Sequence, residues 1–282
     1  MRHAMCILAL AGLASAATAG DKVVSFANGA EGWSINGWTT PDLAGGNPNE
    51  NLHWDDFVET FGLEIRTDEG APNTDFVHDL TTHQSVTLSV DVKVNYIQFF
   101  GSPADRDLIV EIRDYDNVST GYPYCSVWVN LGILPGAPSE SGWTTYSATF
   151  DPNSSELPAG WGGYGDEDPN TFEPILPADR TFSDVLAGAD QVLFTTYVPG
   201  FFYGFTNFNI QVDNIRIQTT DAGGCNGADL AEPFGQLDFS DVVAFLTAFG
   251  NMEAGADLAE PFGQWDFSDV VEFLSQFGTG CP

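Results

Sequence analysis

Basic residues are the scarcest feature of this sequence. Only 8 Lys and Arg stand against 40 Asp and Glu among 282 residues, which gives a formal net charge of −32 at pH 7. Binding to nucleic acid or to an anionic membrane requires clustered Lys and Arg, so the composition excludes both as main functions. A solvated acidic surface, high-salt surroundings or divalent cations are compatible with this charge.

Long hydrophobic runs are also missing. The one candidate covers residues 4 to about 14 and is too short to span a bilayer. It follows Arg2 and His3 and precedes Ala17-Thr18-Ala19, which is the layout of a signal peptide, residues 1–19, cleaved after Ala19. The sequence therefore predicts a secreted, extracellular protein without membrane insertion, either free or attached to a cell surface.

Cysteine is rare, and only Cys125, Cys225 and Cys281 remain after the predicted cleavage. In an exported protein, Cys225 and Cys281 are the natural disulfide pair, because they flank the C-terminal repeat described below. Cys125 begins an apolar, strand-like run and is predicted to be a buried, inert thiol.

Motifs of common hydrolases are absent from the sequence. There is no Gly-x-Ser-x-Gly and no His-Glu-x-x-His. Adjacent acids such as Asp55-Asp56 are expected by chance in so acidic a chain, so they do not indicate the carboxylate pair of a glycosidase. We expect a non-catalytic protein, with an enzyme as the alternative.

Residues 20–220 carry the pattern of an all-β domain. Apolar residues alternate with polar ones at 86–94, 108–112, 146–150, 192–196 and 208–212. Clusters of Gly, Pro, Asn and Asp separate these runs, which predicts a mainly β fold of the jelly-roll β-sandwich type. One short helix is expected at residues 181–186, before Gly188.

Short motifs in this domain resemble secreted β-sandwich domains of the laminin-B and galactose-binding-like kind. They are Phe26 to Trp33, Gly45-Gly46-Asn47-Pro48, and Val212 to Ile217. The resemblance implies a jelly roll that sometimes binds carbohydrate and often holds a structural calcium, for which Asp213 is the candidate ligand. The alternative is that Asp213 caps a strand and a turn.

Three tryptophans, Trp33, Trp38 and Trp54, are candidate carbohydrate-binding residues. A flat aromatic ring offers a low-entropy contact to the C–H face of a sugar. The alternative is that these rings fill the core of the sandwich. Polysaccharide is thus a candidate ligand for this domain.

The last sixty residues contain one stretch twice. Residues 228–250 and 256–278 agree at 19 of 23 positions, which indicates one supersecondary unit used twice. Each copy has an acidic segment with a glycine, Gly235 or Gly263, and then an amphipathic run. The pattern predicts two acidic loops that lead into helices beginning near Asp238 and Asp266 and ending at Gly250 and Gly278.

Residues 221–282 resemble dockerin modules, in particular the variant that closes with Gly-Cys, here Gly280-Cys281. The resemblance implies docking onto a cohesin-like or other surface protein, and Ca²⁺ held by two EF-hand-like loops. The implied ligands are Asp229, Glu232, Gln236, Asp238 and Asp241 in the first copy and Asp257, Glu260, Gln264, Asp266 and Asp269 in the second. The implied partner-binding residues are Phe239, Ser240, Phe267 and Ser268.

The loops depart from the dockerin pattern. Counted back from Asp241, the twelfth, ninth and sixth positions match, but Ala-Glu-Pro-Phe replaces the middle acids and adds one residue. Weaker calcium binding is one expectation, and a loop held by Pro233, Phe234 and the disulfide is another. Acids that only cap helices are the alternative to calcium ligands, and core packing is the alternative for Phe239 and Phe267.

The sequence thus predicts a secreted, non-catalytic protein that docks through its C-terminal module and carries a β-sandwich for carbohydrate. A polysaccharide-active enzyme and a structural surface or matrix component are the alternatives.

Overall fold

The computed structural model describes residues 19–55, 59–67, 74–137, 142–221, 226–231, 234–259 and 263–281. The chain divides into two compact units, Ala19–Thr220 and a second that contains Asp221–Pro282. Residues 1–18 and Cys225 lie outside the described residues, so the signal peptide and the Cys225–Cys281 disulfide stay predictions.

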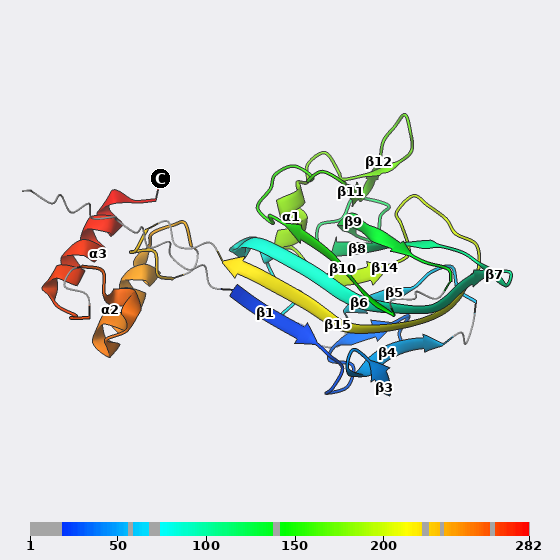
Figure 1. The fold of residues 1–282 in the computed structure, drawn as a ribbon. Helices are drawn as coiled ribbons and strands as arrows, with labels where there is room; N and C mark the ends of the chain where they lie inside the picture. Colours follow the sequence, from blue (N-terminus) through cyan, green and yellow to red (C-terminus); the bar gives the residue numbers. More distant parts are fainter. Residues whose placement is uncertain are drawn as a thin grey trace, which may run out of the picture. The chain divides into compact units, whose positions relative to one another are not determined.

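The first unit is a sandwich of two antiparallel sheets (Figure 1). The larger sheet has the order β10–β6–β15–β4–β3, with β1 paired to β15 and β7 to β6. Its strands are β1 (Ala19–Val24), β3 (Asp42–Gly46), β4 (Asn49–Asp55), β6 (His83–Phe99), β7 (Ser102–Pro103), β10 (Trp143–Phe150) and β15 (Asn207–Asp221).

The smaller sheet has the order β11–β9–β8–β14–β5–β2. Its strands are β2 (Trp33–Ile35), β5 (Glu64–Thr67), β8 (Arg106–Asp114), β9 (Cys125–Leu134), β11 (Trp161–Tyr164) and β14 (Gln191–Thr195). The short strands β12 (Asp166–Glu167) and β13 (Pro174–Ile175) pair with each other. The predicted mainly β sandwich is confirmed.

The core lies between the two sheets and follows the alternation in the sequence. Every second residue of β6 from Val86 to Val94 is buried, and so are Leu108, Val110 and Ile112 of β8. Successive side chains of a strand point to opposite faces, so this spacing sends all of them into one shared core.

The short helix α1 (Phe182–Ala187) confirms the helix expected before Gly188. Thr181 caps it by accepting a hydrogen bond from the Asp184 backbone N–H, and the Asp184 side chain accepts one from the Thr181 backbone. Such a reciprocal pair satisfies two N–H groups that the first helical turn leaves open. Phe182, Val185 and Leu186 face the core. The one-turn 3₁₀ helix η1 (Leu80–Thr82) precedes β6.

The second unit consists of the helices α2 (Phe239–Asn251) and α3 (Phe267–Thr279), with the 3₁₀ turn η2 (Ala254–Ala256) before the second loop. The predicted starts are confirmed, because Asp238 and Asp266 are the N-caps. The predicted end at Gly250 is wrong. Helix α2 ends at Asn251, and its C-cap is Met252, which is left-handed and donates its N–H to the carbonyls of Ala248 and Phe249. No helix in the described ranges is long and apolar enough to cross a membrane.

Cys125 is a free cysteine and is fully buried. Burial raises the pKa of its thiol to about 11, so the reactive thiolate is scarce at neutral pH. The prediction of a buried, inert thiol is confirmed.

Trp33 is a core residue, and the prediction that it binds carbohydrate is wrong. Its ring is fully buried and meets Phe76 edge-on, with 5.1 Å between the ring centroids, and Phe194 at 6.1 Å. The ring belongs to the core between the sheets, and no surface of it is left for a sugar.

Replacing Trp33 with Ala should lower the free energy of unfolding of the β unit by about 3–5 kcal/mol, because it empties a buried indole site. Trp38→Ala, at an exposed ring, should change it by less than about 1 kcal/mol. Urea unfolding followed by near-UV circular dichroism measures both. Equal losses in the two variants would contradict the assignment of Trp33 to the core.

Candidate functional site

Trp38 and Trp54 line one cavity of about 340 Å³, together with Asn36 and Gly37. An adjoining cavity of about 390 Å³ shares three of these residues. It adds Glu59, Thr60, Glu64, Arg66 and Tyr197. We term the two cavities the tryptophan groove. Two of the three tryptophans singled out in the sequence thus lie at one place on the surface.

A tight turn after β2 places Trp38 in the groove. Ile35 and Trp38 exchange two backbone hydrogen bonds of 2.8 and 2.9 Å across Asn36-Gly37. Both central residues have positive φ, 47° at Asn36 and 81° at Gly37. A two-residue hairpin turn of type I′ requires positive φ at both positions, and Asn-Gly adopts this conformation more readily than other pairs. The Trp38 ring stays 44% exposed, and its Nε1 donates to the Thr40 carbonyl.

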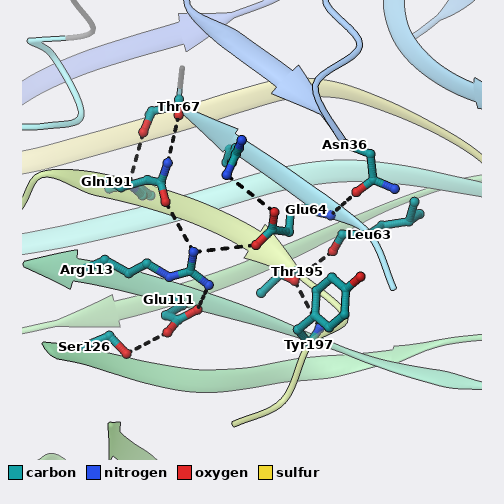
Figure 2. Close-up of polar contacts among 12 residues, drawn as sticks. Asn36, Leu63, Glu64, Thr67, Glu111, Arg113, Ser126, Gln191, Thr195 and Tyr197 are labelled. Atoms are coloured by element: carbon teal, nitrogen blue, oxygen red, sulfur yellow. Dashed lines mark hydrogen bonds and ion pairs between the residues drawn. The ribbon is translucent and has the colours of Figure 1, made fainter. Parts of the chain in front are cut away.

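Asn36 fixes this turn to strand β5. Its Oδ1 accepts a hydrogen bond from the Glu64 backbone N–H at 2.9 Å, and its own N–H donates to the Glu64 carbonyl at 2.8 Å. Figure 2 shows Asn36 beside Leu63 and Glu64, with Tyr197 at the end of β14. Asn36 and Glu64, which both line the groove, are therefore fixed to each other by two hydrogen bonds.

The carboxylate of Glu64 is held between two arginines. Its oxygens lie 3.5 Å from Nη1 of Arg66 and 3.5 Å from Nη1 of Arg113. Arg113 also binds Glu111 at 2.8 Å, and Glu111 accepts from the Ser126 hydroxyl, so a buried polar network extends from Glu64 across the smaller sheet (Figure 2). Burial alone would lower the pKa of Arg113, but the carboxylate of Glu111 raises it, and the guanidinium stays charged.

Sequence reasoning missed Glu64, Arg66 and Tyr197 as groove residues. They stand on β5 and after β14, and only the pairing of β14 with β5 brings them together. The one local signal was Asn36-Gly37, because this pair marks a tight turn beside an aromatic residue.

In the second unit, the last acid of each repeat ties its loop to the helix. Asp241 Oδ1 accepts hydrogen bonds from the N–H groups of Leu230 and Ala231, both at 2.8 Å, and its Oδ2 accepts from Asp238 N–H at 2.8 Å. In the second copy, Asp269 Oδ1 accepts from Leu258 and Ala259 at 2.8 and 2.9 Å, and its Oδ2 accepts from Asp266 at 2.9 Å. Both carboxylates are fully buried.

The first acid of each repeat binds the turn glycine. Asp229 Oδ2 accepts from Gly235 N–H at 2.6 Å, and Asp257 Oδ2 accepts from Gly263 N–H at 2.5 Å. Both glycines have φ near +87°, which confirms the predicted turn at each of them. The N-caps Asp238 and Asp266 accept from Ser240 and Ser268 N–H.

The described residues expected to bind Ca²⁺ do not converge. Within the described ranges, no group of three or more His, Cys, Asp or Glu side chains is arranged to hold a metal ion. Gln236 and Gln264 are exposed, and Glu232 and Glu260 lie outside the described residues. The described carboxylates are instead acceptors for backbone N–H groups.

Asp213 of β15 is also an acceptor for backbone N–H groups. Its carboxylate is buried and accepts from Asn47 N–H, in the turn between β3 and β4, and from Asn214 N–H. Burial raises the pKa of Asp213 above its ordinary value, although these hydrogen bonds lower it. This geometry matches the alternative in which Asp213 caps a strand and a turn.

The expected partner-binding residues are exposed on both helices. Phe239 and Phe267 are 77% and 76% exposed, so the core alternative for these two rings is wrong. One and two turns further on, Val243 and Leu246 of α2 are 48% and 59% exposed, and Val271 and Leu274 of α3 are 50% and 59% exposed. We term these the two apolar stripes.

Phe239, Val243 and Leu246 therefore do not form the core of the second unit. The core is formed by Phe245 and Phe273, whose rings stack with centroids 4.2 Å apart. Val242 and Phe249 pack beside them. Helix α2 is therefore apolar on two sides, one in the core and one exposed.

Neither a protein-family model nor a curated protein sequence matches this chain. Three solved structures are similar to it. One is the C-terminal family 22 carbohydrate binding module of Clostridium thermocellum Xyn10B, with 12% identity and a TM-score of 0.36, covering 71% of this chain and 94% of that one. Another is an exo-beta-agarase, with 13% identity and a TM-score of 0.33, covering 77% of this chain and 26% of that one. The third is a family 30 carbohydrate binding module, with 11% identity and a TM-score of 0.28, covering 61% of this chain and 75% of that one. Similarity at this level is too low to assign a function.

Replacing Phe245 with Ala should lower the free energy of unfolding of the second unit by about 3–5 kcal/mol, because it removes half of the stacked pair. Phe239→Ala, on the same helix, should change it by less than about 1 kcal/mol, since its ring is in solvent. Differential scanning calorimetry of the full chain reads the transition of this unit. Similar losses for the two variants would disprove the division of the helix into a core side and an exposed side.

Proposed function

We propose that the protein is secreted and non-catalytic, and that its β unit binds a neutral polysaccharide in the tryptophan groove. The observation that carries the proposal is that Trp38, on the turn after β2, and Trp54, on β4 of the larger sheet, line one cavity together with fixed polar groups. Aromatic rings cover the C–H faces of a sugar, and polar side chains fix its hydroxyls.

The size and charge of the groove support this ligand class. Each cavity falls within the range of about 300–1,000 Å³ that is typical of small-ligand sites. Glu59 and Glu64 face the same cavity as Arg66, and the whole chain carries a net charge of −32. An acidic polysaccharide would be repelled, whereas a neutral one meets no such barrier.

For the second unit, we infer docking onto a partner protein of the cohesin-like kind through the two apolar stripes. A monomeric protein rarely leaves Phe, Val and Leu exposed in a row on a helix, and exposed apolar patches mark interaction sites. The stripes have the same residues and nearly equal exposure in both copies. The docking unit would attach the carbohydrate-binding unit to an assembly or a cell surface.

Trp38→Ala and Tyr197→Ala should each weaken binding to the best polysaccharide by at least about tenfold, because each removes an exposed ring from the groove. A glycan array identifies that polysaccharide, and affinity electrophoresis measures the loss. Phe172→Ala is the matched control, because this ring is exposed but lies outside the groove.

Retention of binding in both groove variants, or preference for acidic glycans, would contradict the proposal.

The second candidate is an enzyme, since two carboxylates, Glu59 and Glu64, line one cavity. Release of reducing sugar by the wild-type chain, lost in Glu59→Gln, would favour that candidate over a binding protein.

For docking, Phe239→Ser and Phe267→Ser combined should abolish capture of the partner from the surface fraction of the producing organism. Each single variant should keep part of it, because one stripe stays intact. Pull-down with the full chain, quantified by mass spectrometry, measures the capture. Phe172→Ser should match the wild type, and undiminished capture by the double variant would reject the stripes as the docking surface.

A further inference from the structure

We infer that the two repeated loops close without calcium. In an EF-hand-like loop the ion joins the loop to the helix, and here the buried carboxylates of Asp241 and Asp269 make that connection. The inference concerns how the module folds and does not depend on what the module docks to. It replaces the calcium sites that the dockerin resemblance implies.

The oxygens of the last acid are already occupied. In a calcium loop, the last acid gives both of its oxygens to the ion. Here each of these carboxylates accepts three backbone N–H groups, which use three of about four lone-pair positions. Those N–H groups turn their positive ends toward the oxygens, so a cation on the same oxygens would meet positive hydrogens.

The three N–H groups come from both ends of the loop. For Asp241, two belong to Leu230 and Ala231 near the start of the repeat, and one belongs to Asp238 at the helix N-cap. Asp241 itself lies in the first turn of α2. One carboxylate therefore joins the start of the loop, its end and the helix, and this is the connection that calcium provides in an EF-hand.

The second copy repeats the arrangement independently. The three distances at Asp269 agree with those at Asp241 to within about 0.1 Å. The residue before the N-cap differs, Leu237 in one copy and Trp265 in the other, yet the hydrogen bonds are the same. The pattern therefore follows from the residues that the copies share.

Few carboxylate oxygens of the described loop residues remain open to an ion. Calcium takes six to eight oxygen ligands. In the second loop, Asp257 gives one oxygen to Gly263 N–H, and its Oδ1 is buried without a hydrogen-bond partner among the described residues. Asp266 caps the helix with Oδ1. Among residues 257–259 and 263–269, no three acidic side chains are arranged to hold an ion.

The decisive experiment is thermal unfolding of the full chain, in millimolar CaCl₂ and in EDTA, read at the transition of the second unit. The melting temperature should be the same in both. A site with a Kd of about one-thousandth of the calcium concentration would raise it by several degrees. A rise that saturates with calcium would overturn the inference.

Two variants test the role of the carboxylates. Asp241→Asn and Asp269→Asn should lower the melting temperature of this transition, equally in calcium and in EDTA, because an amide offers one acceptor oxygen where the carboxylate offers two. Asp238→Asn is the matched control and should have little effect, since Asn caps a helix as well as Asp does. The inference would be overturned if the wild type melted at a higher temperature in calcium than in EDTA and each of the three variants lost this difference.

Direct binding is read on the wild-type chain, so the test survives if the variants fail to fold. Terbium replaces calcium in oxygen sites, and Trp265 lies in the second loop, where its indole can sensitise terbium emission. We expect no saturable emission that calcium competes away. Emission that calcium displaces and that Asp257→Asn abolishes would establish an ion in this loop.

Discussion

The core shared by the two sheets determines which residues of the first unit are left for binding. Each strand sends alternate side chains inward, and Val, Leu, Ile and Phe fill that space completely. Polar and aromatic groups that meet solvent are therefore confined to turns, strand ends and the outer faces. The tryptophan groove arises there: Trp38 stands on a turn that reverses the chain after β2, and Trp54 lies on β4 at the margin of the core.

The second unit builds its core from far fewer residues. Among its described residues, the buried apolar side chains are Phe245, Phe273, Ala228 and Ala256. A core this small supplies little stability, and units of this size usually need a disulfide, a metal or oligomerisation in addition. We infer that the aspartate–amide hydrogen bonds in both loops add stability here. One side of each helix is left apolar and exposed.

Local patterns in the sequence predicted the local structure well. The strands with strict alternation, helix α1, and the Asp caps of α2 and α3 depend on neighbouring residues and could be predicted from the sequence. The faces of these elements could not. Trp33 and Trp38 flank the same short segment, yet one is core and one lines the groove, because the turn at Asn36-Gly37 falls between them. Helix α2 has two apolar sides, so its periodicity could not decide between Phe239 and Phe245. Arg66 and Tyr197 join the groove only through strand pairing, which leaves no trace in the local sequence.

The scarcity of cations links the two proposed contacts. In the described part of the chain, arginines form ion pairs with acids of the same unit: Arg66 binds Glu64, Arg113 binds Glu111, Arg180 binds Asp114 and Arg216 binds Asp21. The surface is left strongly acidic, so long-range attraction can draw in only cationic partners. A neutral sugar on aromatic rings and a protein on apolar stripes are both recognised through short-range contact, which a net charge of −32 neither assists nor prevents. The inferred closure of the loops by carboxylates that accept backbone N–H groups follows the same principle, because it requires no ion from the solvent.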